Sequence, residues 1–159
     1  AISEIQKLFF DKIEIYYDEN TLIAQSQNFE FFTKLINGKF PDYNRVIPQE
    51  IKKRLKLSRD KMLEGIKTVS IISDTMKITF AQQTITFESI VEDNSEAKTV
   101  IDFQTGLDEE ISIGVRNRYL LDFLSNIEEN DFELGFNDSN LAFTVSSNEL
   151  KTVIMPINL

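Results

Sequence analysis

An internal repeat is the feature that most constrains the fold of this 159-residue chain. Residues 110–155 contain, in order, one alternating run, one stretch with helical spacing and three further alternating runs. Alternation of apolar and polar residues is typical of a half-buried strand, and apolar residues three or four apart are typical of an amphipathic helix. Residues 54–103 show the same order, and residues 1–35 show it without the leading strand. We therefore predict an α+β fold of βαβββ units used in pairs.

The repeat also predicts the domain organisation. The last two units form a complete domain over residues 51–159, and residues 1–50 form the second half of another domain, cut before its leading strand. We expect helices over residues 1–10, 59–72 and 116–127. Each helix has a single apolar stripe, so an antiparallel sheet should lie on one side of it and leave the other side open. The first residue is not Met, and we expect the chain to be a piece of something longer.

The charges are segregated along the chain. The formal net charge is −9, yet residues 51–67 carry seven Lys and Arg against two Asp and Glu. A basic patch on an acidic chain indicates two surfaces with different partners, or solvated charge without a role. The predicted helices place Lys7, Lys61 and Arg118 opposite their apolar stripes. They are either a cationic surface or ordinary cations of a helix surface.

Composition excludes most catalytic chemistry. The chain has no Cys and no His, so it lacks disulfides, thiol nucleophiles and the most common general base and transition-metal ligand. The acidic runs at residues 108–110 and 128–131 are the remaining catalytic candidates, with solvated charge as the alternative. No spacing matches a P-loop or a dinucleotide-binding motif. We expect no catalytic residues, no metal site and no cofactor.

No apolar run approaches the roughly 18 residues of a membrane span, and no secretory segment stands at the start. The absence of Cys fits a reducing compartment. We therefore expect a cytoplasmic protein without membrane contact.

Three apolar features are candidates for binding. Ile71 and Ile72 fall on the polar side of their helix, which indicates contact with another chain, or else the helix ends before Ile71 and both enter the core. Residues 40–48 contain two Pro and are predicted to be an ordered, extended connector. The tail, residues 153–159, is apolar to its last residue, so it is either buried or part of a groove for a short peptide with a hydrophobic anchor.

The two Pro-containing segments resemble a known family. The run Lys34-Leu-Ile-Asn-Gly-Lys-Phe-Pro-Asp-Tyr43, followed by Arg45-Val-Ile-Pro48, is similar to the "G-[RK]-[FY]-P-x-Y…P" stretch of the bacterial replicative sliding clamps, the β subunits of DNA polymerase III. The tail Val153-Ile-Met-Pro-Ile-Asn-Leu159 resembles that family's C-terminal "V-[VI]-M-P-[MI]-x-[LI]". The resemblance covers the whole chain, as the back half of the middle domain and all of the last domain.

The resemblance implies a fold and a function. The fold would be the DNA-clamp fold, in which helices line the hole of a homodimeric ring around duplex DNA and sheets form the outside. Such a ring is a processivity factor rather than an enzyme. Its partners would be duplex DNA, bound without regard to sequence, and the replicative polymerase, the clamp loader and repair proteins, bound through short linear motifs.

The resemblance also implies three sets of site residues. The peptide groove would use Pro41, Arg45, Val46, Val153, Ile154, Met155, Pro156 and Ile157. The cations facing DNA would be Lys7, Lys61 and Arg118. The ring interface would use Ile71, Ile72, Glu92, Asp93 and Glu96.

The chain departs from the family pattern in places. Asn44 and Asn158 stand where many relatives have Arg, which bears on groove affinity, and the strand that links Met76 to the helix is shorter than in some relatives. Two alternatives stay open: a stand-alone peptide-binding module that encircles no DNA, and a hydrolase that uses the acidic runs.

Overall fold

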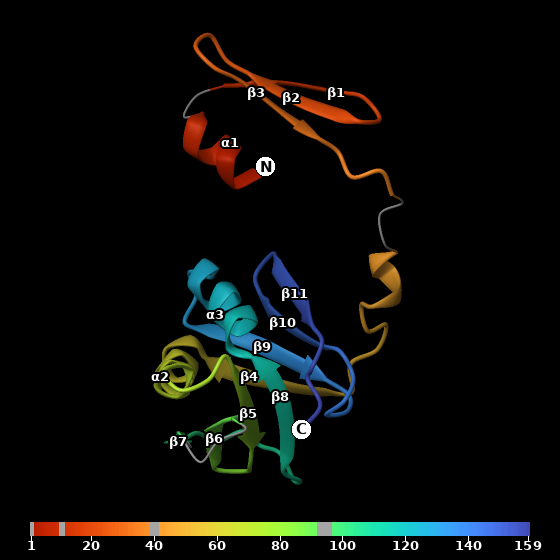
Figure 1. The fold of residues 1–159 in the computed structure, drawn as a ribbon. Coiled ribbons are helices and arrows are strands. Elements are labelled where there is room, and N and C mark those ends of the chain that lie inside the picture. The colour runs from red at the N-terminus through yellow and green to blue at the C-terminus, as the bar shows by residue number, and fades with distance from the viewer. Residues whose placement is uncertain (1, 10–11, 39–41, 92–96) are drawn as a thin grey trace. The chain divides into compact units, whose positions relative to one another are not determined.

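The structure of the chain, a computed structural model, describes residues 2–9, 12–38, 42–91 and 97–159 (Figure 1). The chain forms two compact units, Ala1–Pro41 and Asp42–Leu159. This division falls inside the Pro-containing connector, earlier than the boundary after residue 50 that the repeat predicts.

The first unit is one helix followed by one sheet. Helix α1 (Ile2–Leu8) precedes strands β1 (Glu14–Tyr17), β2 (Thr21–Gln25) and β3 (Glu30–Lys34). The sheet has the order β1-β2-β3 and is antiparallel. Among its described residues only Ala24 is a buried apolar residue. The predicted order of one helix and three strands is therefore present, without an extensive core of its own.

The second unit contains two successive βαβββ units, as the repeat predicts. After a short 3₁₀ turn, η1 (Tyr43–Arg45), its elements follow in this order: β4 (Lys53–Ser58), α2 (Arg59–Ser70), β5 (Thr75–Phe80), β6 (Thr84–Ser89), β7 (Lys98–Asp102), β8 (Ile111–Arg116), α3 (Asn117–Asn126), β9 (Asp131–Phe136), β10 (Phe143–Ser147) and β11 (Leu150–Ile154).

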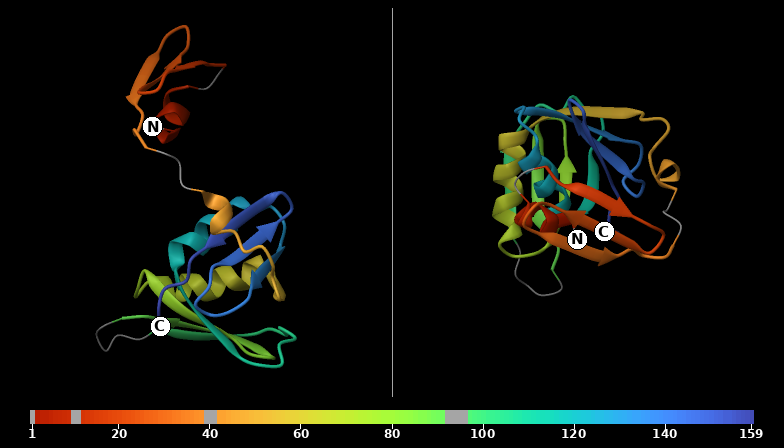
Figure 2. Two further views of the ribbon diagram at one scale, coloured as in Figure 1. Left: turned by 90° about the vertical axis from the view of Figure 1, so that its right-hand side faces the viewer. Right: turned by 90° about the horizontal axis from the view of Figure 1, so that it is seen from above.

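The two βαβββ units exchange their leading strands. One sheet has the order β11-β10-β9-β4 and the other has the order β7-β6-β5-β8. Strand β4 pairs with β9 through Leu55 opposite Leu134, and β8 pairs with β5 through Ile113 opposite Ile78. Each leading strand thus completes the sheet of the other unit, which ties the two into one domain (Figures 1 and 2).

Both helices and both sheets contribute to a single hydrophobic core. Helix α2 buries Met62, Gly65, Ile66 and Val69, packs on β5, β6 and β7, and contacts α3. Figure 1 shows the two helices next to each other. A Cβ atom at Gly65 would overlap the ring of Phe87, so this helix approaches the sheet closely only because that position has no side chain.

Two local predictions need correction. Ser58 is the N-cap of α2, but its side chain makes no capping hydrogen bond, and the amide of Arg59 donates to the carbonyl oxygen of Asn130 at 2.6 Å instead. The connector is not extended throughout, because the amide of Arg45 donates to the carbonyl oxygen of Asp42 at 3.2 Å and closes the 3₁₀ turn.

Candidate functional site

An apolar groove lies between helix α3 and the C-terminal strand. It encloses about 760 Å³. Helix α3 supplies one wall through Tyr119, Asp122, Phe123 and Asn126, and the other wall is residues 150 and 152–155. The four helix residues are spaced three or four apart, so they share one face of α3. The groove has the size and the largely apolar lining of a site for a small ligand or a peptide side chain.

The structure brings part of the predicted groove together. Val153, Ile154 and Met155 line it, and the side chain of Met155 is 59% exposed. Pro156 and Ile157 continue beyond the groove, where the amide of Ile157 donates to the carbonyl oxygen of Gly114 in β8. Figure 1 shows the C-terminus beside β8.

The connector residues of the predicted groove lie elsewhere in the second unit. Arg45 and Val46 are exposed and do not line the groove. The Nε atom of Arg45 lies 3.2 Å from a carboxylate oxygen of Asp42, so the guanidinium already has a partner. Pro41 lies outside the described residues.

The helix wall of the groove was not predicted from the sequence. Tyr119 is 48% exposed and Phe123 is 3% exposed, with the Phe123 ring packed edge-on against Phe132 at 5.6 Å between centroids. The signal was available, because Tyr119, Phe123 and Asn126 recur at helical spacing beside the core stripe of the same helix.

The predicted interface residues fall in two adjoining segments. The helix α2 ends at Ser70, yet Ile71 and Ile72 do not enter the core: their exposed fractions are 84% and 44%. The hydroxyl of Ser73 donates to the carbonyl oxygen of Ile90 at 2.6 Å, so the end of α2 lies beside the segment that leads to residues 92–96. Glu92, Asp93 and Glu96 themselves lie outside the described residues.

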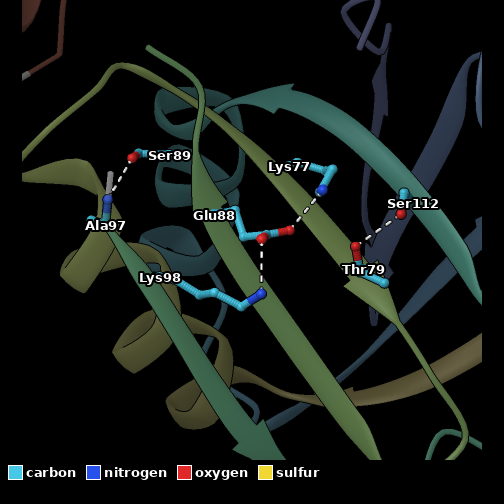
Figure 3. A network of polar contacts seen from close by, with 7 residues as sticks. All are labelled: Lys77, Thr79, Glu88, Ser89, Ala97, Lys98 and Ser112. Carbon is cyan, nitrogen blue, oxygen red and sulfur yellow. Dashed lines mark hydrogen bonds and ion pairs between the residues drawn. The ribbon is translucent and has the colours of Figure 1, made fainter. Parts of the chain in front are cut away.

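A polar clasp ties the hairpin that carries this segment to the sheet (Figure 3). The carboxylate of Glu88 on β6 accepts the ammonium of Lys77 on β5 at 2.7 Å and that of Lys98 on β7 at 3.0 Å. These two hydrogen bonds, first that of Lys77 and then that of Lys98, hold the pKa of Glu88 below its ordinary value. The amide of Ala97 also donates to the hydroxyl of Ser89 at 2.8 Å. The edge strand β7 is thereby fixed close to the predicted interface.

The three predicted DNA-facing cations all have partners within the chain. Lys7 pairs with Glu4 at 3.1 Å and Arg118 pairs with Asp122 at 3.5 Å, both on exposed surfaces. Such exposed pairs contribute little free energy, so both cations can exchange their carboxylate for a phosphate.

Lys61 is held more firmly than a surface cation. Its ammonium donates to the carbonyl oxygen of Asp102 at 2.7 Å and lies 5.7 Å from the centroid of the Phe103 ring. Helical spacing in the sequence places Leu63 in the apolar stripe of α2, whereas the structure buries Gly65 and only partly buries Leu63. The buried face of α2 is therefore rotated toward Lys61.

Lys67 points farther from the core than Lys61. It lies in the last turn of α2, is exposed, and has no ion-pair partner among the described residues. Helical geometry at 100° per residue places it almost opposite Met62, Ile66 and Val69. The sequence alone does not single it out, because its orientation depends on which residues of α2 are buried.

The acidic runs show no catalytic arrangement. Within residues 2–9, 12–38, 42–91 and 97–159 there is no group of three or more side chains that could hold a metal ion. Asp131 pairs with Lys56 at 2.8 Å across β4 and β9. In the same described ranges, no helix has the length and apolar character required to cross a membrane.

Comparison with known proteins points to one family. A family model described as "DNA polymerase III beta subunit, C-terminal domain" matches residues 44–158. Beta sliding clamps from two strains of Helicobacter pylori are each 31% identical to the chain over 172 aligned residues, which cover 100% of this chain and 46% of each relative. The chain thus spans less than half the length of these relatives.

Solved structures give the same result. The crystal structure of the Helicobacter pylori beta clamp bound to a DNA ligase peptide matches 99% of this chain and 44% of that chain, with a TM-score of 0.85 and 31% identity. The DNA polymerase III subunit beta of Pseudomonas aeruginosa matches 99% of this chain and 46% of that chain, also with a TM-score of 0.85, at 24% identity. The second match supports the fold alone. The sliding-clamp fold that the sequence motifs imply is thereby confirmed.

Proposed function

We propose, from the premise that the chain belongs to the family of C-terminal domains of DNA polymerase III beta subunits, that it is the last part of a DNA sliding clamp. The complete ring would encircle duplex DNA and tether the replicative polymerase and other replication proteins. The beta sliding clamp family is non-catalytic, and the chain is not an enzyme.

The observation that carries this proposal is the apolar groove between α3 and the tail. Met155 is an exposed apolar side chain that faces a wall containing Tyr119 and Phe123. A short peptide with a hydrophobic anchor can bury both its own side chain and Met155 in such a groove. A solved relative, the Helicobacter pylori beta clamp, was crystallised with a DNA ligase peptide. We propose that the groove of this chain binds peptides of the same kind from the polymerase, the clamp loader and repair proteins.

Tethering explains why such a groove serves replication without chemistry. A polymerase held by its peptide on a ring around DNA meets the template again intramolecularly, at an effective concentration set by its linker. Weak peptide affinity therefore suffices for processive synthesis. It also allows one partner to be replaced by another.

Ring closure would use the exposed pair Ile71 and Ile72. Adjacent exposed aliphatic side chains are costly in water and favour burial against another protein chain. The neighbouring acidic residues Glu92, Asp93 and Glu96 would face a basic surface of that second chain. We propose that the ring is a homodimer of the longer protein.

Contact with DNA would be electrostatic and independent of sequence. Lys7, Lys61 and Arg118 would face the phosphates, and we add the unpaired Lys67 of α2 to this set. Cations that meet phosphates through exchangeable ion pairs position a protein on DNA without reading bases, which allows the ring to slide.

The groove is tested with a fluorescent copy of the DNA ligase peptide that the Helicobacter pylori relative binds. We expect the 159-residue chain to bind it, and deletion of Met155–Leu159 to abolish binding because one wall of the groove is lost. Met155→Ala should weaken binding about tenfold or more. Val100→Ala, which shortens another half-exposed apolar side chain outside the groove, is the matched control. Unchanged affinity after the deletion would contradict the groove as the peptide site.

A further inference from the structure

The C-terminal tail is anchored on both sides of Met155. Before it, Ile154 is paired with Phe143 in the sheet that contains β11. After it, the amide of Ile157 donates to the carbonyl oxygen of Gly114 at 2.9 Å, which forms a bridge to β8 in the other sheet. Pro156 stands between the two anchors, and its ring restricts the backbone. Met155 is therefore exposed yet held at a defined place on the surface.

Gly114 provides the space for this crossing. A Cβ atom at Gly114 would lie 2.7 Å from the carbonyl oxygen of Ile157, 2.9 Å from its Cγ1 atom and 2.9 Å from a Cδ atom of Leu159. The nearest of these atoms belongs to the backbone, so a change of rotamer cannot relieve the overlap. Any side chain at position 114 must push the tail away from β8.

Space, rather than backbone conformation, is what position 114 requires. Among the described residues, Gly106 is the glycine with a positive φ angle. Gly114 lies inside β8 and has ordinary strand pairing with Lys77. Alanine could therefore adopt the backbone of β8 at this position but could not leave the tail in place.

One strand supports both walls of the groove. Strand β8 receives the tail at Gly114, and it ends at Arg116, directly before α3 begins at Asn117. Helix α3 carries Tyr119 and Phe123 on the opposite wall. A shift of the tail relative to β8 therefore changes the distance between the two walls.

We propose that Gly114 is a positioning residue of the peptide groove, which holds Met155 in its binding position by admitting the tail onto β8. The inference rests on the proposed peptide-binding function. A groove whose walls are already fixed loses less conformational entropy when a peptide binds. The contribution of Gly114 is this preorganisation, because it lines no part of the groove itself.

The first test compares Gly114→Ala with the unchanged 159-residue chain, using the same fluorescent DNA ligase peptide. We expect the peptide to bind about tenfold more weakly to the variant. Gly38→Ala is the matched control, because nothing lies within 4 Å of a Cβ atom at Gly38, and it should leave the affinity unchanged. Wild-type affinity in Gly114→Ala would overturn the inference while leaving the groove intact.

A second comparison separates positioning from a general effect on β8. Deletion of Ile157–Leu159 removes every tail atom that the new Cβ would meet, while it retains Met155. This deletion should itself weaken binding about tenfold, and Gly114→Ala should cause no further loss in the shortened chain. An equal loss from Gly114→Ala in both chains would show that the residue acts through β8 or α3 and would contradict the proposal. Full affinity in the shortened chain would contradict it too.

Hydrogen exchange supplies a readout that needs no peptide. The Ile157 amide should be protected in the unchanged chain and should exchange rapidly in Gly114→Ala, while amides in β5 and β6 stay protected. Persistent protection of Ile157 in the variant would refute the proposal. If the unchanged chain binds no peptide but Ile157 loses protection as expected, the proposed groove fails and the structural role of Gly114 stands apart from it.

Discussion

The ammonium group of Lys61 donates a hydrogen bond to the carbonyl oxygen of Asp102, 2.7 Å away, and thereby joins helix α2 to strand β7. The same ammonium lies over the ring of Phe103. Lys61 therefore stabilises the packing of α2 on its sheet, in addition to any contact with DNA.

Replacement of Lys61 should accordingly cost stability. We expect Lys61→Ala to lower the free energy of unfolding by about 1 kcal/mol, the usual value for one hydrogen bond with a weak cation–π contact. Lys67→Ala on the same helix should change it by less than about 0.5 kcal/mol. Urea unfolding followed by circular dichroism measures both. Equal effects of the two substitutions would show that the contacts of Lys61 are not stabilising.

The clasp at Glu88 should make stability depend on pH. Lys77 and Lys98 lower the pKa of Glu88 in the folded chain below the ordinary value of 4.5. A lowered folded pKa means that the stabilisation is complete above the unfolded pKa and is lost as the pH falls through the folded pKa. We expect Glu88→Gln to lower the free energy of unfolding by about 1 kcal/mol at pH 7, and the difference from the unchanged chain to shrink below about pH 4.5.

Urea unfolding between pH 7 and pH 3 measures this difference. Glu109→Gln is the matched control, because Glu109 has no hydrogen-bond or ion-pair partner within the described ranges. A difference for Glu88→Gln that stays constant down to pH 3 would contradict the clasp.

Gly65 should resist substitution despite its place in a helix. Alanine has the higher helix propensity by roughly 1 kcal/mol, which favours Gly65→Ala in isolation. The new methyl group would overlap the ring of Phe87, however, and overpacking costs about 1–3 kcal/mol. We expect net destabilisation in thermal unfolding. A higher melting temperature for the variant would show that the ring of Phe87 moves aside freely.

The order of helices and strands could be predicted because it depends on local periodicity. Alternation over residues 131–136 and helical spacing in α3 are both properties of short windows. The exchange of β4 and β8 between the two sheets could not be predicted in this way. It depends on pairings such as Leu55 with Leu134, which are far apart in the sequence.

The groove was predictable only in part for the same reason. The apolar tail with Met155 is visible in the sequence, whereas its opposite wall depends on how α3 is oriented over β11. The place of Lys61 depended on Gly65, which carries no apolar side chain and yet belongs to the buried face. Packing geometry, rather than composition, decides both cases.

Retention on circular DNA tests the clamp function most directly. The longer protein that carries this chain as its C-terminal part is loaded on a closed duplex circle and washed with salt that disrupts phosphate contacts. A ring should remain on the closed circle and leave as soon as the circle is cut, because it is held by topology rather than by charge. Rapid loss from the closed circle would contradict encirclement and would favour a peptide-binding module that surrounds no DNA.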